Sequence, residues 1–225
     1  VDQSLQRRSS NCYCASACWV RFMQSNFYTS LLQDLDTAKK ITNGVPLNAC
    51  NTDLQELKVK SYILMSHAVI EQYLESIALD IARKALRLLI DEGKFCRALV
   101  GLISSGLIGK IDESGISKKL KREPFEDIEL FANTAFGRYR TVLSNNHGIK
   151  NDDQLRIFLP IGVDPAAEDF PTMAALDGFG TKRGNIAHTF KINKAHTLSE
   201  IYSDIETIKS GLIAYDLACL RCLEV

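Results

Sequence analysis

The sequence has no excess of charge of either sign, because 27 Lys and Arg residues are balanced by 27 Asp and Glu residues. This balance argues against extended, non-specific binding to duplexes, which depends on neutralising many phosphates. It leaves room for a compact site with a few cations, since the sign of a local patch is independent of the total. No apolar run reaches the roughly 18 residues that a membrane span needs, so we expect no membrane partner.

Several motifs of well-known chemistry are also missing. The patterns GxGxxG, GxxxxGK[ST] and HExxH do not occur, so the sequence offers no motif for dinucleotide binding, for a P-loop nucleotide site or for a zinc peptidase. The seven cysteines are odd in number and irregularly spaced, which favours free thiols in a reducing cytoplasm over a disulfide framework. The clusters Cys12-x-Cys14-x₃-Cys18 and Cys219-x₂-Cys222 could form a four-ligand zinc site only by combining across the whole chain, which nothing in the sequence supports. We therefore expect neither a metal nor another cofactor.

No stretch alternates apolar and polar residues convincingly enough to predict a strand, whereas helical periodicity is strong. Between Thr52 and Asp91 apolar residues recur every three or four positions without Gly or Pro. Thr52 with Gln55 resembles a capping box, and Gly93 suits the end of a helix. Such a long helix needs several partners to cover its apolar stripe, so we expect an all-α helical bundle with one very long helix and additional short helices.

The same patterns predict the domain organisation. Residues 1–27 have no sustained period and are expected to form a weakly ordered extension, whereas 28–225 form one helical domain. The stretch 109–124 combines Gly and Pro with basic residues and is expected to be a solvated loop. The other predicted helices are Phe95–Leu107, Glu126–Leu143, Asp152–Phe158, one that starts at Ala167, and Thr197–Leu223.

Four histidines are available for proton transfer. We expect His67 to be a packed or half-exposed residue of the long helix, and His196, just before the last helix, to face solvent. Arg183 precedes His188 by five residues in the segment TKRGNIAHT. An imidazole can take a proton from a ribose 2′-hydroxyl or deliver one to the leaving oxygen, while a guanidinium neutralises charge on the phosphate. This pair can therefore build a phosphodiester-cleaving site without a metal.

The spacing of this pair sets a geometric condition. On a regular helix, residues five apart point about 140° away from each other, so Arg183 and His188 would flank a groove. Either the chain departs from a regular helix near Gly184, or the site draws on a second copy of the chain.

The segment KRGNIAHT, before the last long helix of an all-α chain, resembles the R-x₄₋₆-H motif of the HEPN superfamily. The nearest likeness is to RiboL-PSP and MAE-type HEPN domains of bacterial defence and toxin–antitoxin systems. The segments LMSHAVIEQYLE at 64–75 and LDGF at 176–179 fit the same pattern, and the resemblance covers about residues 55–220. It implies a bundle that dimerises so that two motifs face one another. Many members are metal-independent endoribonucleases, and others bind RNA or a partner without activity.

By this resemblance Arg183 and His188 take the catalytic positions. The residue after the arginine is typically Asn in the family, but it is Gly184 here. Either Asn185, one step later, substitutes for that polar residue, or the site is weakened. Glu71 is a candidate to orient Arg183, with a plain helix-surface glutamate as the alternative.

Further cations are candidates for holding phosphates. Lys182 lies next to the motif arginine, and Arg138 and Arg140 could approach the same groove, although scattered surface charges explain them equally well. Arg140 also starts a rival match to the motif, which ends at His147. The rival places both side chains on one helical face, but the polar run from 144 to 148 is typical of a turn.

The leading hypothesis is a cytoplasmic, homodimeric endoribonuclease with Arg183, His188 and Asn185 in the site, active in defence or toxin–antitoxin biology. A second hypothesis is a non-catalytic module that binds RNA or a protein partner, such as an antitoxin or a defence effector. A third is a helical scaffold in which Arg183 and His188 only satisfy polar groups.

Overall fold

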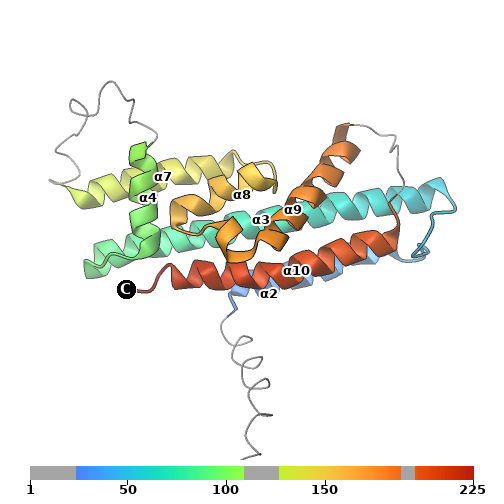
Figure 1. Cartoon of the computed structure of the whole chain (residues 1–225), viewed down its shortest axis with the longest axis horizontal. Coiled ribbons are helices and arrows are strands. Elements are labelled where there is room, and N and C mark those ends of the chain that lie inside the picture. The colour runs from blue at the N-terminus through green and yellow to red at the C-terminus, as the bar shows by residue number, and fades with distance from the viewer. Residues whose placement is uncertain (1–23, 109–126, 189–195) are drawn as a thin grey trace, which may run out of the picture.

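The computed structural model describes residues 24–108, 127–188 and 196–225 (Figure 1). These ranges contain helices and no β-strand, so the all-α prediction is confirmed. In chain order the elements are α2 (Asn26–Lys39), the 3₁₀-helix η1 (Lys40–Thr42), α3 (Asp53–Glu92), α4 (Arg97–Ile108), α7 (Ile128–Ser144), α8 (Asn151–Phe158), the 3₁₀-helix η2 (Leu159–Ile161), α9 (Pro165–His188) and α10 (Leu198–Arg221).

The long helix α3 is the centre of the bundle, and its ends are where the sequence predicts them. The hydroxyl of Thr52 accepts a hydrogen bond from the backbone N–H of Gln55 at 3.2 Å, which satisfies a donor of the first turn. Gly93 ends the helix with φ of 66°, a left-handed conformation that glycine adopts without steric cost. Each of the other described α-helices packs against α3. Its stripe is buried accordingly, with Ile63, Ile70, Leu74 and Ala78 fully enclosed.

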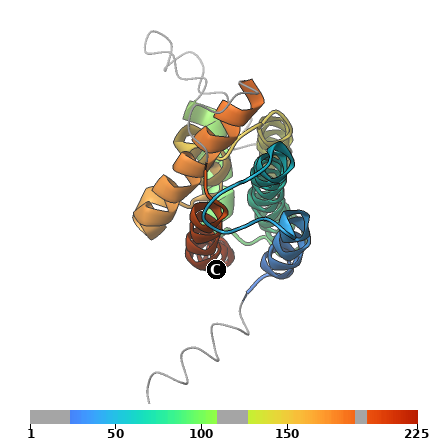
Figure 2. The ribbon, with the colours of Figure 1, turned by 90° about the vertical axis from the view of Figure 1, so that its right-hand side faces the viewer.

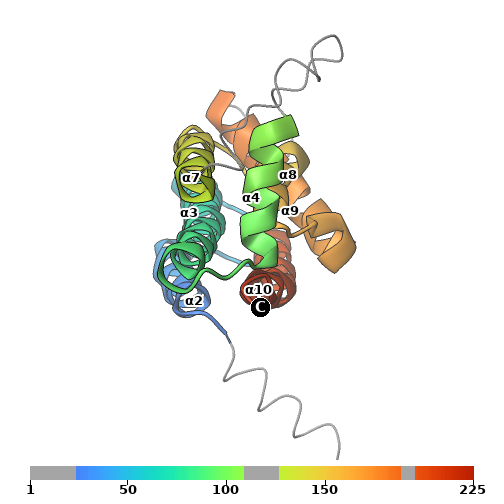
Figure 3. The same ribbon diagram turned by 90° about the vertical axis from the view of Figure 1, so that its left-hand side faces the viewer.

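The helices form two layers when the molecule is seen along its long axis (Figures 2 and 3). One layer holds α2, α3 and α7, and the other holds α4, α9 and α10. A buried carboxylate joins three of these helices: Asp216 of α10 accepts hydrogen bonds from the backbone N–H of Ser25 at 2.7 Å, from the Ser25 hydroxyl, and from the Tyr73 hydroxyl at 3.0 Å. The Ser25 hydroxyl also caps α2. The start of α2 is therefore tied to the core at Asp216.

The helix α9 contains a break at Asp169, whose φ and ψ of −160° and 88° are not helical. The Asp169 carboxylate accepts from the Thr172 backbone N–H at 3.4 Å, which caps the second, longer part of the helix, and from the Thr172 hydroxyl at 2.7 Å. Pro171 is tolerated there because first-turn N–H groups have no intrahelical acceptor. Thr172 packs closely on Gly211 of α10, where a Cβ would lie 1.5 Å from its hydroxyl oxygen. Beyond this anchor the last turns of α9 rise away from the bundle (Figures 1 and 2).

The predicted boundaries differ from the structure in a few places. Helix α2 was not predicted individually, and it begins at Asn26, inside the expected extension of residues 1–27. Residues 1–23 and the expected loop 109–124 lie outside the described residues. The helix expected from Ala167 starts at Pro165, because proline is well suited to the first position of a helix.

Candidate functional site

The segment that carries Arg183 and His188 forms the last turns of α9. The described backbone is helical through Gly184 to His188, so the local departure that we considered near Gly184 is not there. Positions 183 and 188 are therefore about 140° apart around the helix axis. A Cβ added at Gly184 would meet no atom within 4 Å, so packing does not require a glycine at this position.

Arg183 is half-buried, and it faces charged residues on α3. His67, Glu71 and Glu75 recur at every fourth residue of α3 and thus share one face of that helix. His67 is 2% exposed, as expected for a packed residue, and its Nδ1 lies 3.5 Å from Oε2 of Glu71. Burial, followed by the nearby positive charge of Arg183, lowers the pKa of His67 to about 4. His67 is therefore neutral at pH 7, and its burial keeps its imidazole out of reach of a substrate.

Glu71 is the point where three parts of the chain meet. Burial raises the pKa of its carboxyl, and the neighbouring Glu75 raises it further. Arg183 of α9 and His147 of the loop between α7 and α8 both lower the pKa of Glu71. The hydrogen bond from Asn146 to Glu75 and the packing of α9 on α3 bring the segments that carry these two residues to α3.

The loop between α7 and α8 is held against α3 by one amide. Helix α7 ends at Ser144, which confirms the predicted turn. The buried Asn146 donates from Nδ2 to Oε1 of Glu75 at 2.8 Å and to the Gly148 carbonyl at 2.9 Å. His147, the next residue, is exposed beside this anchor. The rival motif therefore has no continuous helix between its arginine and His147.

We refer to the charged and polar residues around Glu71 as the polar cluster. Asp153 of α8 belongs to the polar cluster, because its negative charge raises the pKa of both His67 and Glu71. Its carboxylate is fixed by the backbone N–H of Lys150 at 3.1 Å and by an ion pair with Arg156. The members of the polar cluster are His67, Glu71, Glu75, Asn146, His147, Asp153 and Arg183.

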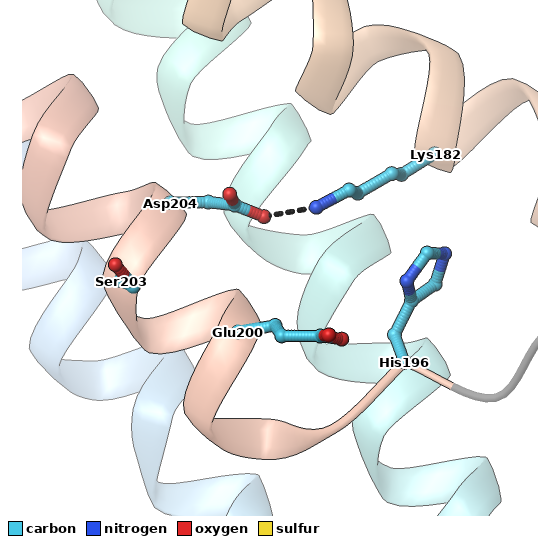
Figure 4. A pocket seen from close by; sticks show the side chains of 5 residues that line it. All are labelled: Lys182, His196, Glu200, Ser203 and Asp204. Carbon is cyan, nitrogen blue, oxygen red and sulfur yellow. Dashed lines mark hydrogen bonds and ion pairs between the residues drawn. The ribbon is translucent and has the colours of Figure 1, made fainter.

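Lys182 points away from the polar cluster's carboxylates to a different partner. Its ammonium forms an ion pair with Asp204 of α10, across a pocket of about 330 Å³ (Figure 4). His196, Glu200 and Ser203 line the rest of this pocket. His196 is half-buried in the pocket wall rather than fully solvent-facing, which corrects the sequence-based expectation. In this pocket His196 lies beside Lys182 of α9 and Glu200 of α10 (Figure 4).

The remaining predicted residues lie on the surface or at the edge of what is described. Asn185 is exposed on α9, Arg138 and Arg140 are exposed on the last turns of α7, and His188 is the final residue of α9. Within the described ranges, no group of three or more His, Cys, Asp or Glu side chains is placed to hold a metal ion. The described cysteines Cys50, Cys96, Cys219 and Cys222 are free thiols. None of the described helices has the length and apolarity to cross a membrane.

The bundle and the placement of its motif define a HEPN-type domain. A model of the RiboL-PSP-HEPN family matches residues 24–220, which include the whole polar cluster. The chain therefore belongs to the RiboL-PSP-HEPN family, and the sequence-based assignment is confirmed. Membership points to RNA-related, ribonuclease-like chemistry. No curated protein and no solved structure matches the chain significantly.

Proposed function

We propose that this protein is a metal-independent endoribonuclease whose site is built around Arg183 and His188. The observation that carries the proposal is the position of Arg183: it lies half-buried near Glu71 on the segment that resembles the family motif. A guanidinium carries planar donors that match the oxygens of a phosphate. The four free thiols of the described part fit a protein of the reducing cytoplasm.

In the proposed reaction, the charge that builds on the scissile phosphate is stabilised by Arg183. His188 accepts or donates a proton, because imidazole titrates near neutral pH. Asn185, exposed two residues after Arg183, contacts the substrate or orients the pair. Arg138 and Arg140 hold flanking phosphates. Lys182 would join them only if RNA competes with Asp204 for its ammonium.

We further propose that two copies of the chain complete the site. Positions 183 and 188 are about 140° apart on a regular helix, so one substrate phosphate is best reached by the arginine of one copy and the histidine of the other. The last turns of α9 project from the bundle, where a second copy can approach them (Figure 1). Leu57 and Leu64, which are 47% and 38% exposed, share the α3 face that leads to Glu71 and supply apolar area for such a contact.

Cleavage of single-stranded RNA or tRNA in EDTA tests the catalytic proposal. We expect products with cyclic-phosphate ends, and we expect Arg183→Ala and His188→Ala each to lower the rate by at least about 100-fold. Arg87→Ala, which removes an exposed arginine of α3 outside the polar cluster, is the matched control. Cutting that survives both site changes rejects the assignment of Arg183 and His188.

Mixing the two inactive variants tests whether the site is shared. If one copy supplies the arginine and the other the histidine, a mixed dimer of Arg183→Ala and His188→Ala retains one intact site of two. After equal mixing and re-equilibration about half of the dimers are mixed, and each mixed dimer has one intact site of two. The mixture should therefore recover about a quarter of the wild-type rate. No restoration, in a mixture shown by light scattering to be dimeric, places both residues in one copy.

A non-catalytic function has one observation in its favour. Gly184 occupies a position where the family typically has Asn, and the structure leaves room there for a side chain. The missing amide is therefore a difference in chemistry and not a consequence of packing. RNA binding without turnover in EDTA, Mg²⁺ or Mn²⁺, or copurification with an antitoxin or defence partner, would favour this binding module over the nuclease.

A further inference from the structure

RNA cleavage through the 2′-oxygen needs two proton transfers. The 2′-hydroxyl loses its proton as O2′ bonds to phosphorus, and the P–O5′ bond breaks as O5′ gains a proton. The products are a 2′,3′-cyclic phosphate and a 5′-hydroxyl, with no other reactant required. In the shared site proposed above, each phosphodiester meets one arginine and one motif histidine, so a second proton-transfer group remains to be found.

His147 meets the requirements for that second group. It is exposed, whereas His67 is buried and neutral, so RNA can reach its imidazole. Its position is fixed from the preceding residue, because Asn146 donates to Glu75 at 2.8 Å and to the Gly148 carbonyl at 2.9 Å. Gly180 of α9, three residues before Arg183, lies against the same loop, since a Cβ added there would be 3.1 Å from the Lys150 side chain and 3.4 Å from that of Ile149. The loop that carries His147 is therefore next to both α3 and the turn of α9 that precedes Arg183.

We propose that His147 is a proton-transfer residue that acts on the same phosphodiester as Arg183 of the same protomer. This inference rests on the proposed ribonuclease function. It pairs His147 with Arg183 of α9, and not with Arg140, its partner in the rival motif. Helix α7 ends at Ser144, so His147 does not continue the helix of Arg140, and Asn146 ties the loop to Glu75 of α3 instead.

The charges around this site come from every element packed there. Glu75 and His67 lie on α3, Asp153 on α8, and Arg183 on α9. Glu71 lies half-buried on the same face of α3, four residues from Glu75, and burial raises the pKa of its carboxyl.

Steady-state kinetics on a short RNA with one cleavage site tests the role of His147. We expect His147→Gln to lower kcat by about 10²- to 10⁴-fold with KM changed by less than about threefold, and to remove one limb of the bell-shaped pH profile of kcat/KM. Asn145→Ala, an exposed change two residues earlier in the same loop, controls for disturbance of the backbone and is expected to retain both limbs. A His147→Gln enzyme with kcat within about threefold of wild type and both limbs intact overturns the inference.

A binding measurement separates this inference from the proposed function. The full-length protein is titrated with 2′-O-methyl RNA, which cannot be cleaved, while the imidazole resonances of His147 are followed by NMR. We expect these resonances to shift on binding, and the shift to be lost in Arg183→Ala. If the wild type shows this shift but never cuts natural RNA, catalysis is rejected while the shared site of His147 and Arg183 stands. If RNA leaves the His147 resonances unchanged, the inference fails.

Discussion

Removal of the buried carboxylate of Asp216 is expected to destabilise the fold more than any surface change. Asp216 is 0% exposed and accepts three hydrogen bonds, two from Ser25 and one from Tyr73. Burial and the nearby negative charge raise the pKa of Tyr73 well above its usual value, so this residue remains a hydroxyl donor at every pH of interest. In Asp216→Ala these three donors lose their acceptor, and the Tyr73 hydroxyl loses it inside the core.

The magnitude follows from the cost of such unpaired groups. Breaking a buried, hydrogen-bonded charged group costs about 3–5 kcal/mol. For a chain of this size, 1 kcal/mol corresponds to about 2–4 °C in Tm, so we expect Tm to fall by roughly 6–20 °C. Tyr73→Phe removes only one donor and is expected to cost about 1–3 kcal/mol.

Thermal unfolding followed by circular dichroism at 222 nm measures both variants. Glu206→Ala is the matched control on the same helix, since this carboxylate is 64% exposed and pairs with Lys209 on the surface. Exposed pairs contribute at most about 1 kcal/mol, so its Tm should fall by no more than about 4 °C. The reasoning would be refuted if Asp216→Ala melted within about 2 °C of this control.

Three further outcomes are expected. Gly211→Ala places a Cβ 1.5 Å from the Thr172 hydroxyl oxygen, so we expect the free energy of unfolding measured in urea to fall by about 1–3 kcal/mol. At Gly137 an added Cβ meets no atom within 4 Å, so Gly137→Ala should raise the free energy of unfolding by about 0.5–1 kcal/mol. Because the pKa of His67 is about 4 in the folded protein and 6.5 in the unfolded chain, its contribution to stability is complete above pH 6.5 and is lost as pH falls to 4. The loss amounts to about 3 kcal/mol, and His67→Gln should flatten this part of a urea-derived stability profile. Lys182→Asp breaks the ion pair with Asp204 and should speed amide hydrogen exchange in the last turns of α9 about two- to fivefold. Adding Asp204→Lys restores an ion pair of swapped charge and should return the exchange rate to that of the wild type. Equal exchange rates in all variants would show that the ion pair does not hold this helix.

Much of the fold was predictable because it depends on local patterns. The apolar period of three and four residues, the threonine caps and the terminal glycine predicted α3 almost to the residue. Helix α10 likewise begins where it was predicted, and a capping box of Thr197 and Glu200 holds its first turn. Helix α2 was harder to find, because its cap, Ser25, is held by Asp216, which is 191 residues away in the chain.

The site was only partly predictable. Arg183 and Glu71 could be linked through the family resemblance, and the turn before Gly148 was correctly located. The stripe of His67, Glu71 and Glu75 at four-residue spacing on an otherwise apolar helix face was a signal that the sequence analysis did not use. Neither periodicity nor motif could show that Asn146 bonds to Glu75, since that contact joins residues 71 positions apart.

The sequence by itself determined the all-α class, the length of the central helix and the family, because helix caps, apolar periodicity and the motif around Arg183 are all local features. Only the tertiary structure decided which groups share a site. Packing of α9 and of the α7–α8 loop on α3 brings Arg183 and His147 to Glu71, and it turns Lys182 toward Asp204. These tertiary contacts depend on how the buried faces of the helices pack together, and the spacing of residues along the chain does not show that packing directly.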